Sequence, residues 1–122
     1  MAQIDRAYVA LALLFLIVGE VLGFVMGMKA DNTWRSVHII IVLVGFVTLA
    51  LFGILYRLWP AMKDGALASA QFWLTIIGFL GILAGSVQML MSGGVVVIAL
   101  GSAMFIIGTL LLGWIFWATS AA

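Results

Sequence analysis

The stretch WRSVHIIIVLVGFVTLALFGILYRLWP, residues 34–60, decides the fold. It is almost wholly apolar over more than the roughly 20 residues that an α-helix needs to cross the hydrocarbon core of a bilayer. Pro60 closes the stretch, because proline lacks the backbone N–H that would continue a helix. The stretch therefore predicts a transmembrane helix from about Trp34 to Trp59.

Three further apolar runs have the same character. We predict spans at about residues 7–28, 70–91 and 95–119, in addition to 34–59. Every backbone polar group must be satisfied inside a bilayer, so helices are the expected conformation. The connections are short, including a loop from Pro60 to about Ser69, and short connections make successive helices antiparallel neighbours. The prediction is one all-α domain, residues 1–122, forming an integral membrane bundle of four transmembrane helices.

Composition excludes several classes of protein. Of the 122 residues, 67% are hydrophobic and 7% are charged, whereas soluble domains carry about 25% charged residues. The formal net charge of +1 gives no reason to expect a nucleic-acid partner. The chain has no cysteine, which rules out disulfides and cysteine-ligated metals. The expected surroundings are the lipid bilayer, and the first run is too long for a cleaved signal peptide.

Charged and aromatic residues give an expected orientation. With four spans, the N-terminus, the middle loop and the C-terminus share a side, which carries Arg6, Arg57 and Lys63. The opposite side carries Lys29 and Arg35, so the positive-inside rule predicts a cytoplasmic N-terminus. Aromatic residues concentrate on the N-terminal side, where we expect an interfacial belt. The residues of this expected belt are Tyr8, Tyr56, Trp59, Trp73, Trp114 and Trp117.

Glycines recur at helical spacing in the predicted spans. Gly19, Gly23 and Gly27 stand four residues apart in the first span, which gives a face of small residues that allows two helix backbones to approach closely. The other spans have similar faces. Helix packing within one bundle is the first interpretation of these faces, and an interface between two copies is the second.

Glu20 is the one acidic residue inside a predicted span. An ionised carboxylate within the bilayer costs several kcal/mol unless it is paired or neutralised, so Glu20 is a candidate for proton or ion coupling. Its position next to the glycine face predicts that it points into the bundle. The alternative is a neutral carboxyl group that is hydrogen-bonded to the backbone or to Thr48.

His38 is the only histidine, about one turn inside the second span. Histidine is a frequent axial ligand of haem iron and a frequent proton carrier. Arg35, three residues earlier, has the charge to pair with a haem propionate or with a lipid headgroup. The alternative for His38 is a hydrogen bond to a carbonyl, to Asp31 or to Asn32. We expect no direct pair with Glu20, because the two depths differ by roughly two turns.

Residues 34–60 resemble the second helix of the catalytic subunits of haem-copper oxidases and nitric oxide reductases. They are more similar still to small four-helix membrane proteins related to those subunits. The resemblance rests on Trp-Arg-Ser-Val-His at 34–38, on Gly45, and on Phe-Gly-Ile-Leu-Tyr-Arg-Leu-Trp-Pro at 52–60. It extends to Gln-Phe-Trp-Leu at 71–74, where the small relatives often show His-Phe-Trp-Leu.

The resemblance implies that His38 is an axial ligand of a b-type haem. The second histidine of the usual His-x-His pattern is Ile40 here, and Gln71 replaces the histidine before Phe-Trp-Leu. One chain therefore cannot form a bis-histidine site, and the histidines needed for oxygen or nitric oxide reduction are missing. We expect a protein without enzymatic activity, in the cytoplasmic membrane of a bacterium. It either binds haem b through His38 or serves as an accessory subunit of a larger membrane complex.

A second resemblance leads to a different function. Gly19-Glu20-Val21-Leu22-Gly23 is similar to the first helix of the small multidrug resistance transporters. In those transporters a membrane-embedded glutamate exchanges protons for cationic drugs, which implies the same role for Glu20 in an antiparallel dimer. The tryptophan-containing motif of their later helices is absent here. In either case we expect a homo-oligomer or a larger membrane complex.

Overall fold

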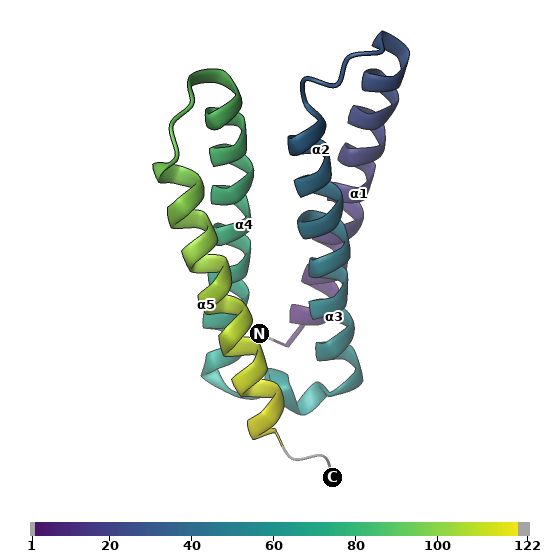
Figure 1. Ribbon diagram of the computed structural model, residues 1–122. Coiled ribbons are helices and arrows are strands. Elements are labelled where there is room, and N and C mark those ends of the chain that lie inside the picture. The colour runs from purple at the N-terminus through teal and green to yellow at the C-terminus, as the bar shows by residue number, and fades with distance from the viewer. Residues whose placement is uncertain (1, 120–122) are drawn as a thin grey trace.

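The computed structural model describes residues 2–119 as two helical hairpins that lie side by side (Figure 1). The first hairpin consists of α1 (Ile4–Lys29) and the second span, and the other consists of α4 (Ala66–Ser92) and α5 (Val96–Ala118). All four helical spans are long and apolar enough to cross a membrane. The protein is therefore an integral membrane bundle of four helices, which confirms the predicted all-α fold.

The second span is not a uniform α-helix. It is built from α2 (Arg35–Ile40), η1 (Ile41–Thr48) and α3 (Leu49–Leu58), of which η1 is a wider π-helical segment. In η1 the hydroxyl of Thr48 donates a hydrogen bond to the carbonyl of Leu43, five residues earlier, at 2.9 Å. Stretches of π-helix are rare and often occur at functional sites. The hydropathy pattern of residues 34–60 does not distinguish this segment from an α-helix.

Two predicted starts need correction, because α1 begins at Ile4 instead of about residue 7 and the middle loop is shorter than expected. The residues after Trp59 form a short 3₁₀ helix, η2 (Pro60–Lys63), and α4 begins at Ala66 instead of about residue 70. At the other end of the bundle α1 ends in a left-handed residue, Ala30. The α4–α5 turn likewise uses Gly93, whose φ of 81° suits glycine because it has no side chain. Both hairpins are therefore closed by tight connections.

Glycines bring the helices of each hairpin into close contact. A Cβ atom on Gly101 of α5 would lie 2.5 Å from the carbonyl carbon of Gly81 on α4, so only glycine fits there. In the first hairpin a Cβ on Gly19 would lie 2.8 Å from the side chain of Val42. The predicted packing of small residues within the bundle is confirmed at these positions. Gly27 differs, because nothing lies within 4 Å of its Cβ position.

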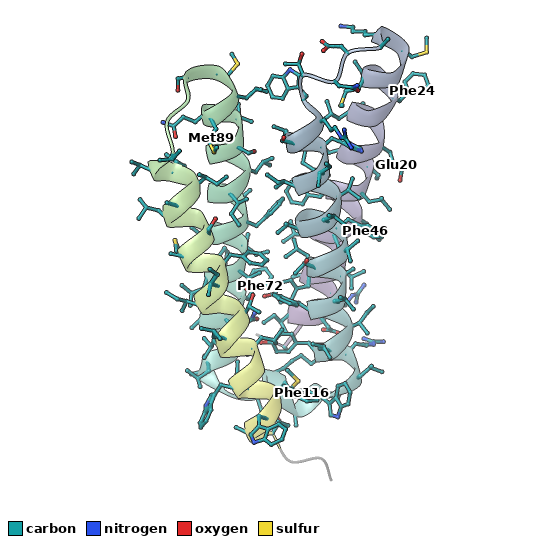
Figure 2. The ribbon with its side chains drawn as sticks, viewed as in Figure 1. Glu20, Phe24, Phe46, Phe72, Met89 and Phe116 are labelled. Carbon is teal, nitrogen blue, oxygen red and sulfur yellow. The ribbon has the colours of Figure 1, made fainter. Side chains whose placement is uncertain are left out.

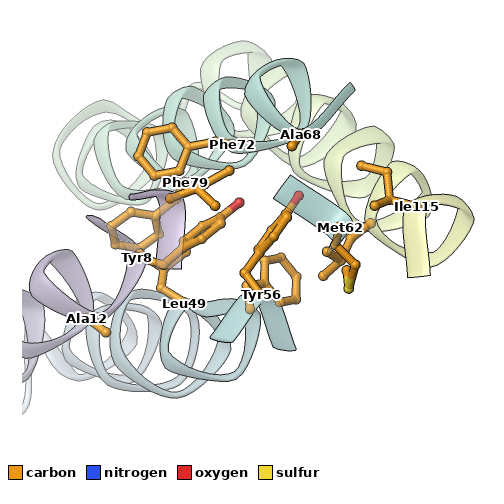
Figure 3. Packing of buried hydrophobic residues seen from close by; sticks show 12 residues of the cluster. Tyr8, Ala12, Leu49, Tyr56, Met62, Ala68, Phe72, Phe79 and Ile115 are labelled. Atoms are coloured by element: carbon orange, nitrogen blue, oxygen red, sulfur yellow. The ribbon is translucent and has the colours of Figure 1, made fainter. Parts of the chain in front are cut away.

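The cluster of buried hydrophobic residues occupies one end of the bundle, and Val37 and Ile41 are buried at the other end. We call the end at which α1 begins and α5 ends the proximal half (residues 4–16, 47–79 and 107–119), and the other end the distal half (17–46 and 80–106). The cluster of buried hydrophobic residues lies wholly in the proximal half, between the two hairpins (Figure 3). Its members are Ile4, Tyr8, Ala12, Leu49, Phe52, Tyr56, Met62, Ala68, Phe72, Phe79, Leu112 and Ile115.

The two tyrosines do not belong to the interfacial belt that we predicted. Tyr8 and Tyr56 are fully buried, and their rings stack between the helices with centroids 6.0 Å apart (Figure 3). The tryptophans of the predicted belt are exposed, Trp117 the most at 84%. The tyrosines differ because their hydroxyl groups find a partner inside the bundle.

Candidate functional site

Gln71 of α4 is the centre of a buried hydrogen-bond network in the proximal half. Its side-chain oxygen accepts hydrogen bonds from the hydroxyl of Tyr8 on α1 at 2.8 Å and from that of Tyr56 on α3 at 3.0 Å. Its side-chain nitrogen donates to the hydroxyl of Thr75 at 2.9 Å and to the carbonyl of Gly108 on α5 at 3.2 Å. One amide group therefore connects all four spans.

An ion cluster lies beside this network, at the proximal edge of the bundle. The carboxylate of Asp5 receives one hydrogen bond from Arg57 at 3.1 Å and one from Lys63 at 3.2 Å. The side chain of Asp5 is 4% exposed and that of Arg57 is 74% exposed. The cluster connects the start of α1 to the end of α3 and to η2. The cluster joins these elements, and the guanidinium group of Arg57 remains accessible.

Neither arrangement was predicted from the sequence. Gln71 drew notice only as a departure from the His-Phe-Trp-Leu pattern, although a polar residue inside an apolar span is itself a signal of a buried hydrogen bond. Asp5 lies 52 residues from Arg57 along the chain, and no local pattern connects them. The tertiary structure alone brings these groups together.

His38, the predicted haem ligand, lies in the distal half against α1. Gly23 makes this possible, because a Cβ at that position would lie 3.0 Å from Cε1 of the imidazole. The ring is half-buried, and its Nδ1 atom is buried without a hydrogen-bond partner among residues 2–119. Buried polar atoms are nearly always paired, so an unpaired one calls for an explanation such as a ligand or a catalytic role.

The loop before His38 does not supply its partner. Asp31 accepts hydrogen bonds from the hydroxyl and the backbone N–H of Thr33, and these bonds hold the pKa of the Asp31 carboxyl below its ordinary value. Arg35, the other predicted haem-site residue, is exposed at the start of α2. The hydrogen bond from His38 to Asp31 that we considered is thus not formed.

Glu20 does not point into the bundle, contrary to our expectation. It is exposed, and Figure 2 shows its side chain directed away from the other helices, like that of Phe24 one turn further along α1. The hydroxyl of Thr48 donates to the carbonyl of Leu43, so it does not donate to Glu20. The reason is helical phase: Gly19 faces the second span, and the next residue is turned by about 100°.

Glu20 and His38 are closer in depth than predicted, yet they remain apart. His38 packs at the level of Gly23, and Glu20 precedes Gly23 by less than one helical turn. The two side chains lie on different faces, because the imidazole contacts the face of α1 that packs on α2 while Glu20 faces outward. The structure therefore does not join the two candidate residues into one site.

Gln88 of α4 carries the second unpaired atom of the distal half. Its Oε1 is buried without a partner, and together with His38 Nδ1 it completes the set of such side-chain atoms among residues 2–119. Within the same residues, no group of three or more His, Cys, Asp or Glu side chains is placed to hold a metal ion. The distal half thus offers an unpaired imidazole and amide inside the bundle and a carboxyl group outside it.

The chain matches no protein-family model, no curated protein and no solved structure. Both family resemblances therefore remain expectations from the sequence.

Proposed function

We propose that this protein is a non-catalytic subunit of a membrane assembly, joined to its partner through the distal face of α1. This face consists of Ile17, Glu20, Phe24 and Gly27, which are exposed and recur at intervals of three and four residues on one side of the helix. The observation that carries the proposal is the outward direction of Glu20 (Figure 2).

Glu20 needs a polar partner at its depth. It lies near the middle of α1, where the surroundings of an isolated chain are lipid hydrocarbon. Ionisable residues at such positions almost always face a bundle interior, a water-filled cavity or another polar group. A partner chain on this face supplies that group and removes Glu20 from contact with lipid.

A second copy of this chain is the partner that the chemistry favours. A protonated carboxyl group has both a donor and an acceptor, so two Glu20 side chains related by a two-fold axis satisfy each other. Gly27 has no atom within 4 Å of its Cβ position, so it leaves space for the close approach of a second α1.

Single cysteines test the interface directly, because the chain has none of its own. We expect Gly27→Cys to form a cross-linked dimer in the membrane under mild oxidation. Gly113→Cys is the matched control, since Gly113 is also open but belongs to α5. Cross-linking at both positions to the same extent, or at neither, would contradict the proposed interface.

Substitution of Glu20 tests the role of the carboxyl group. Glu20→Gln retains a donor and an acceptor and should keep the dimer, whereas Glu20→Leu should weaken it about tenfold, as loss of roughly 1.4 kcal/mol does. The measurement is the dimer fraction in detergent or bilayer as a function of the protein-to-lipid ratio. Equal dimer fractions for the native chain and Glu20→Leu would contradict the role of the carboxyl group.

The unpaired Nδ1 atom of His38 favours haem binding as a second candidate function. A buried polar atom without a partner calls for an explanation such as a bound ligand, and histidine is a frequent axial ligand of haem iron. One histidine per chain fits a haem only as a single axial ligand or as a site shared by two copies, with Arg35 available to a propionate. When bound, a b-type haem supplies reversible one-electron transfer.

An absorption spectrum of detergent-purified protein tests the haem hypothesis. Expression with added haem should give a Soret band that disappears in His38→Ala. Absence of the band from the native chain would exclude the hypothesis, and a band that survives in His38→Ala would move the ligand to another residue. The α1 interface is independent of this outcome, because Glu20 and His38 lie on different faces of the first hairpin.

The transporter hypothesis makes different use of the same carboxyl group. An exposed Glu20 that binds and releases protons would allow proton-coupled exchange of a lipophilic cation. The test is efflux of such a cation from proteoliposomes that carry a pH gradient, with Glu20→Gln as the inactive variant. Efflux abolished by Glu20→Gln would favour transport, since the dimer proposal expects that variant to assemble normally.

We also infer that the proximal end faces the cytoplasm, in the cytoplasmic membrane of a bacterium. Arg6, Arg57 and Lys63 lie at this end, and Lys29 and Arg35 lie at the other. A membrane-impermeant thiol reagent should label a cysteine at Asn32 from outside intact cells. It should leave a cysteine at Asp64 unlabelled until the cells are opened.

A further inference from the structure

A groove between α1 and α3 opens at the proximal edge of the bundle, with a volume of about 540 Å³. Arg6, Arg57 and Asp5 line its polar end. We infer that this groove binds one anionic phospholipid, with its phosphate on the two guanidinium groups and an acyl chain against the apolar wall. This inference goes beyond the proposed assembly, because the groove belongs to the proximal half and does not depend on Glu20.

The charges at the polar end suit a phosphate. Asp5 already accepts hydrogen bonds from Arg57 and Lys63, so its negative charge is compensated from within the protein. Arg57 uses Nη1 for that contact, and its side chain is 74% exposed, which leaves further guanidinium donors directed outward. Arg6 is also exposed and lines the same groove. Two guanidinium groups at one edge bind a phosphate with several charge-assisted hydrogen bonds.

The rest of the groove suits a hydrocarbon chain. Its wall is apolar, formed by Val9, Ala10 and Leu13 of α1 and by Ile54 of α3. From Arg6 to Leu13 the groove follows about two turns of helix, roughly 10 Å, from the basic end toward the middle of the span. A ligand with one charged end and one long apolar end fills both parts, and a phospholipid has this shape.

The depth of the groove agrees with the position of lipid headgroups. The exposed Trp114 and Trp117 lie near the end of α5, at the same end of the bundle as Arg6. Exposed tryptophans near helix ends mark the membrane–water interface. The two arginines therefore lie at the level of the phosphates, and the apolar wall lies at the level of the acyl chains.

Native mass spectrometry of the purified protein tests this inference. The protein is incubated in detergent with equal amounts of phosphatidylglycerol and phosphatidylcholine, and the lipid retained per chain is counted. We expect one retained phosphatidylglycerol per chain, preferred about tenfold over phosphatidylcholine. Arg6→Gln should reduce this preference without affecting the Asp5 cluster, and Arg6→Gln combined with Arg57→Gln should abolish it.

Two variants distinguish lipid binding in this groove from non-specific attraction of anionic lipid to positive charges elsewhere on the protein. Lys29→Gln removes one positive charge from the opposite end of α1 and should leave the preference unchanged. Ala10→Trp fills the apolar wall while both arginines remain, and it should lower retention of the lipid. Equal retention of the two lipids by the native chain would overturn the inference. So would retention that survives both the double arginine variant and Ala10→Trp.

Discussion

The two halves of the bundle differ in how many of their buried polar groups are paired, although buried Ser86 of the distal half does donate a hydrogen bond to the carbonyl of Leu83. In the proximal half Tyr8, Tyr56, Gln71 and Thr75 are buried and hydrogen-bonded to one another, and the buried carboxylate of Asp5 has two basic partners. In the distal half, buried atoms of His38 and Gln88 are unpaired among the described residues. The hydrophobic cluster follows the same division, since all of its members are proximal.

The polar network and the hydrophobic cluster of the proximal half hold the two hairpins together. A fully paired polar network fixes the relative positions of helices, because each group loses its partner when the helices separate. The distal half is held by close glycine contacts within each hairpin, which need no polar group. Its imidazole and amide carry atoms that are unpaired among residues 2–119, and its carboxyl group faces outward; the proposals of an α1 interface and of haem binding start from these groups.

Replacement of Gln71 is expected to have the largest effect on stability. Gln71→Leu leaves the hydroxyl groups of Tyr8 and Tyr56 without their acceptor, at a cost of about 2–4 kcal/mol in the free energy of unfolding. Gln88→Leu on the same helix is the matched control, and it should cost less than about 1 kcal/mol because the Oε1 of Gln88 has no partner. Unfolding in detergent measures both. Equal losses of unfolding free energy in the two variants would contradict the difference that we infer between the two halves.

A methyl group in the glycine contact should have the next largest effect. Gly101→Ala places a Cβ 2.5 Å from backbone atoms of Gly81 and Ile82, so α4 and α5 must separate, at a cost of about 1–3 kcal/mol. Gly113→Ala on the same helix meets nothing within 4 Å and should be neutral or stabilising by up to about 1 kcal/mol. The thermal unfolding midpoints of the two variants should therefore move in different directions. A stable Gly101→Ala protein would show that the distal half is not held by this contact.

Loss of the proximal ion cluster should have a smaller effect. Asp5→Asn removes the charge shared by Arg57 and Lys63 and should lower the free energy of unfolding by about 1 kcal/mol. The loss should shrink at high salt, because the accessible Arg57 is screened. Unfolding measured at low and high ionic strength checks both statements. A loss that does not depend on salt would mean that packing of the side chain, and not its charge, is responsible.

Replacement of His38 is expected to have the smallest effect on folding. His38→Leu removes a buried nitrogen that has no partner, so the free energy of unfolding should change by less than about 1 kcal/mol. Tyr56→Phe, which removes one hydrogen-bonded hydroxyl, is the reference variant whose loss of unfolding free energy is compared with that of His38→Leu. If His38→Leu instead costs more than Tyr56→Phe, the imidazole has a partner that the isolated chain does not supply, such as a ligand or a second subunit.

The sequence predicted the coarse fold well because that fold follows from composition and length. Four apolar runs with short connections allow little besides a four-helix membrane bundle. The glycine spacing likewise indicated which residues would lie in helix contacts; Gly19 and Gly101 confirm this prediction, and Gly27, which contacts nothing within 4 Å, does not. The surroundings of the candidate residues could not be predicted in the same way. On an almost uniformly apolar helix the hydropathy pattern does not indicate which way a given side chain points.

Hydropathy alone predicts that this chain crosses a membrane four times, and the sequence shows that Glu20 is the one acidic residue inside a predicted span and that His38 is the only histidine. Only the tertiary structure decided that Glu20 faces outward, that His38 packs on Gly23 with an unpaired Nδ1, and that Gln71 joins all four spans. The physical reason is that burial in lipid demands apolar residues on every face of a helix. Hydropathy therefore fixes the spans, whereas the rotation and pairing of helices depend on contacts between residues far apart in the chain.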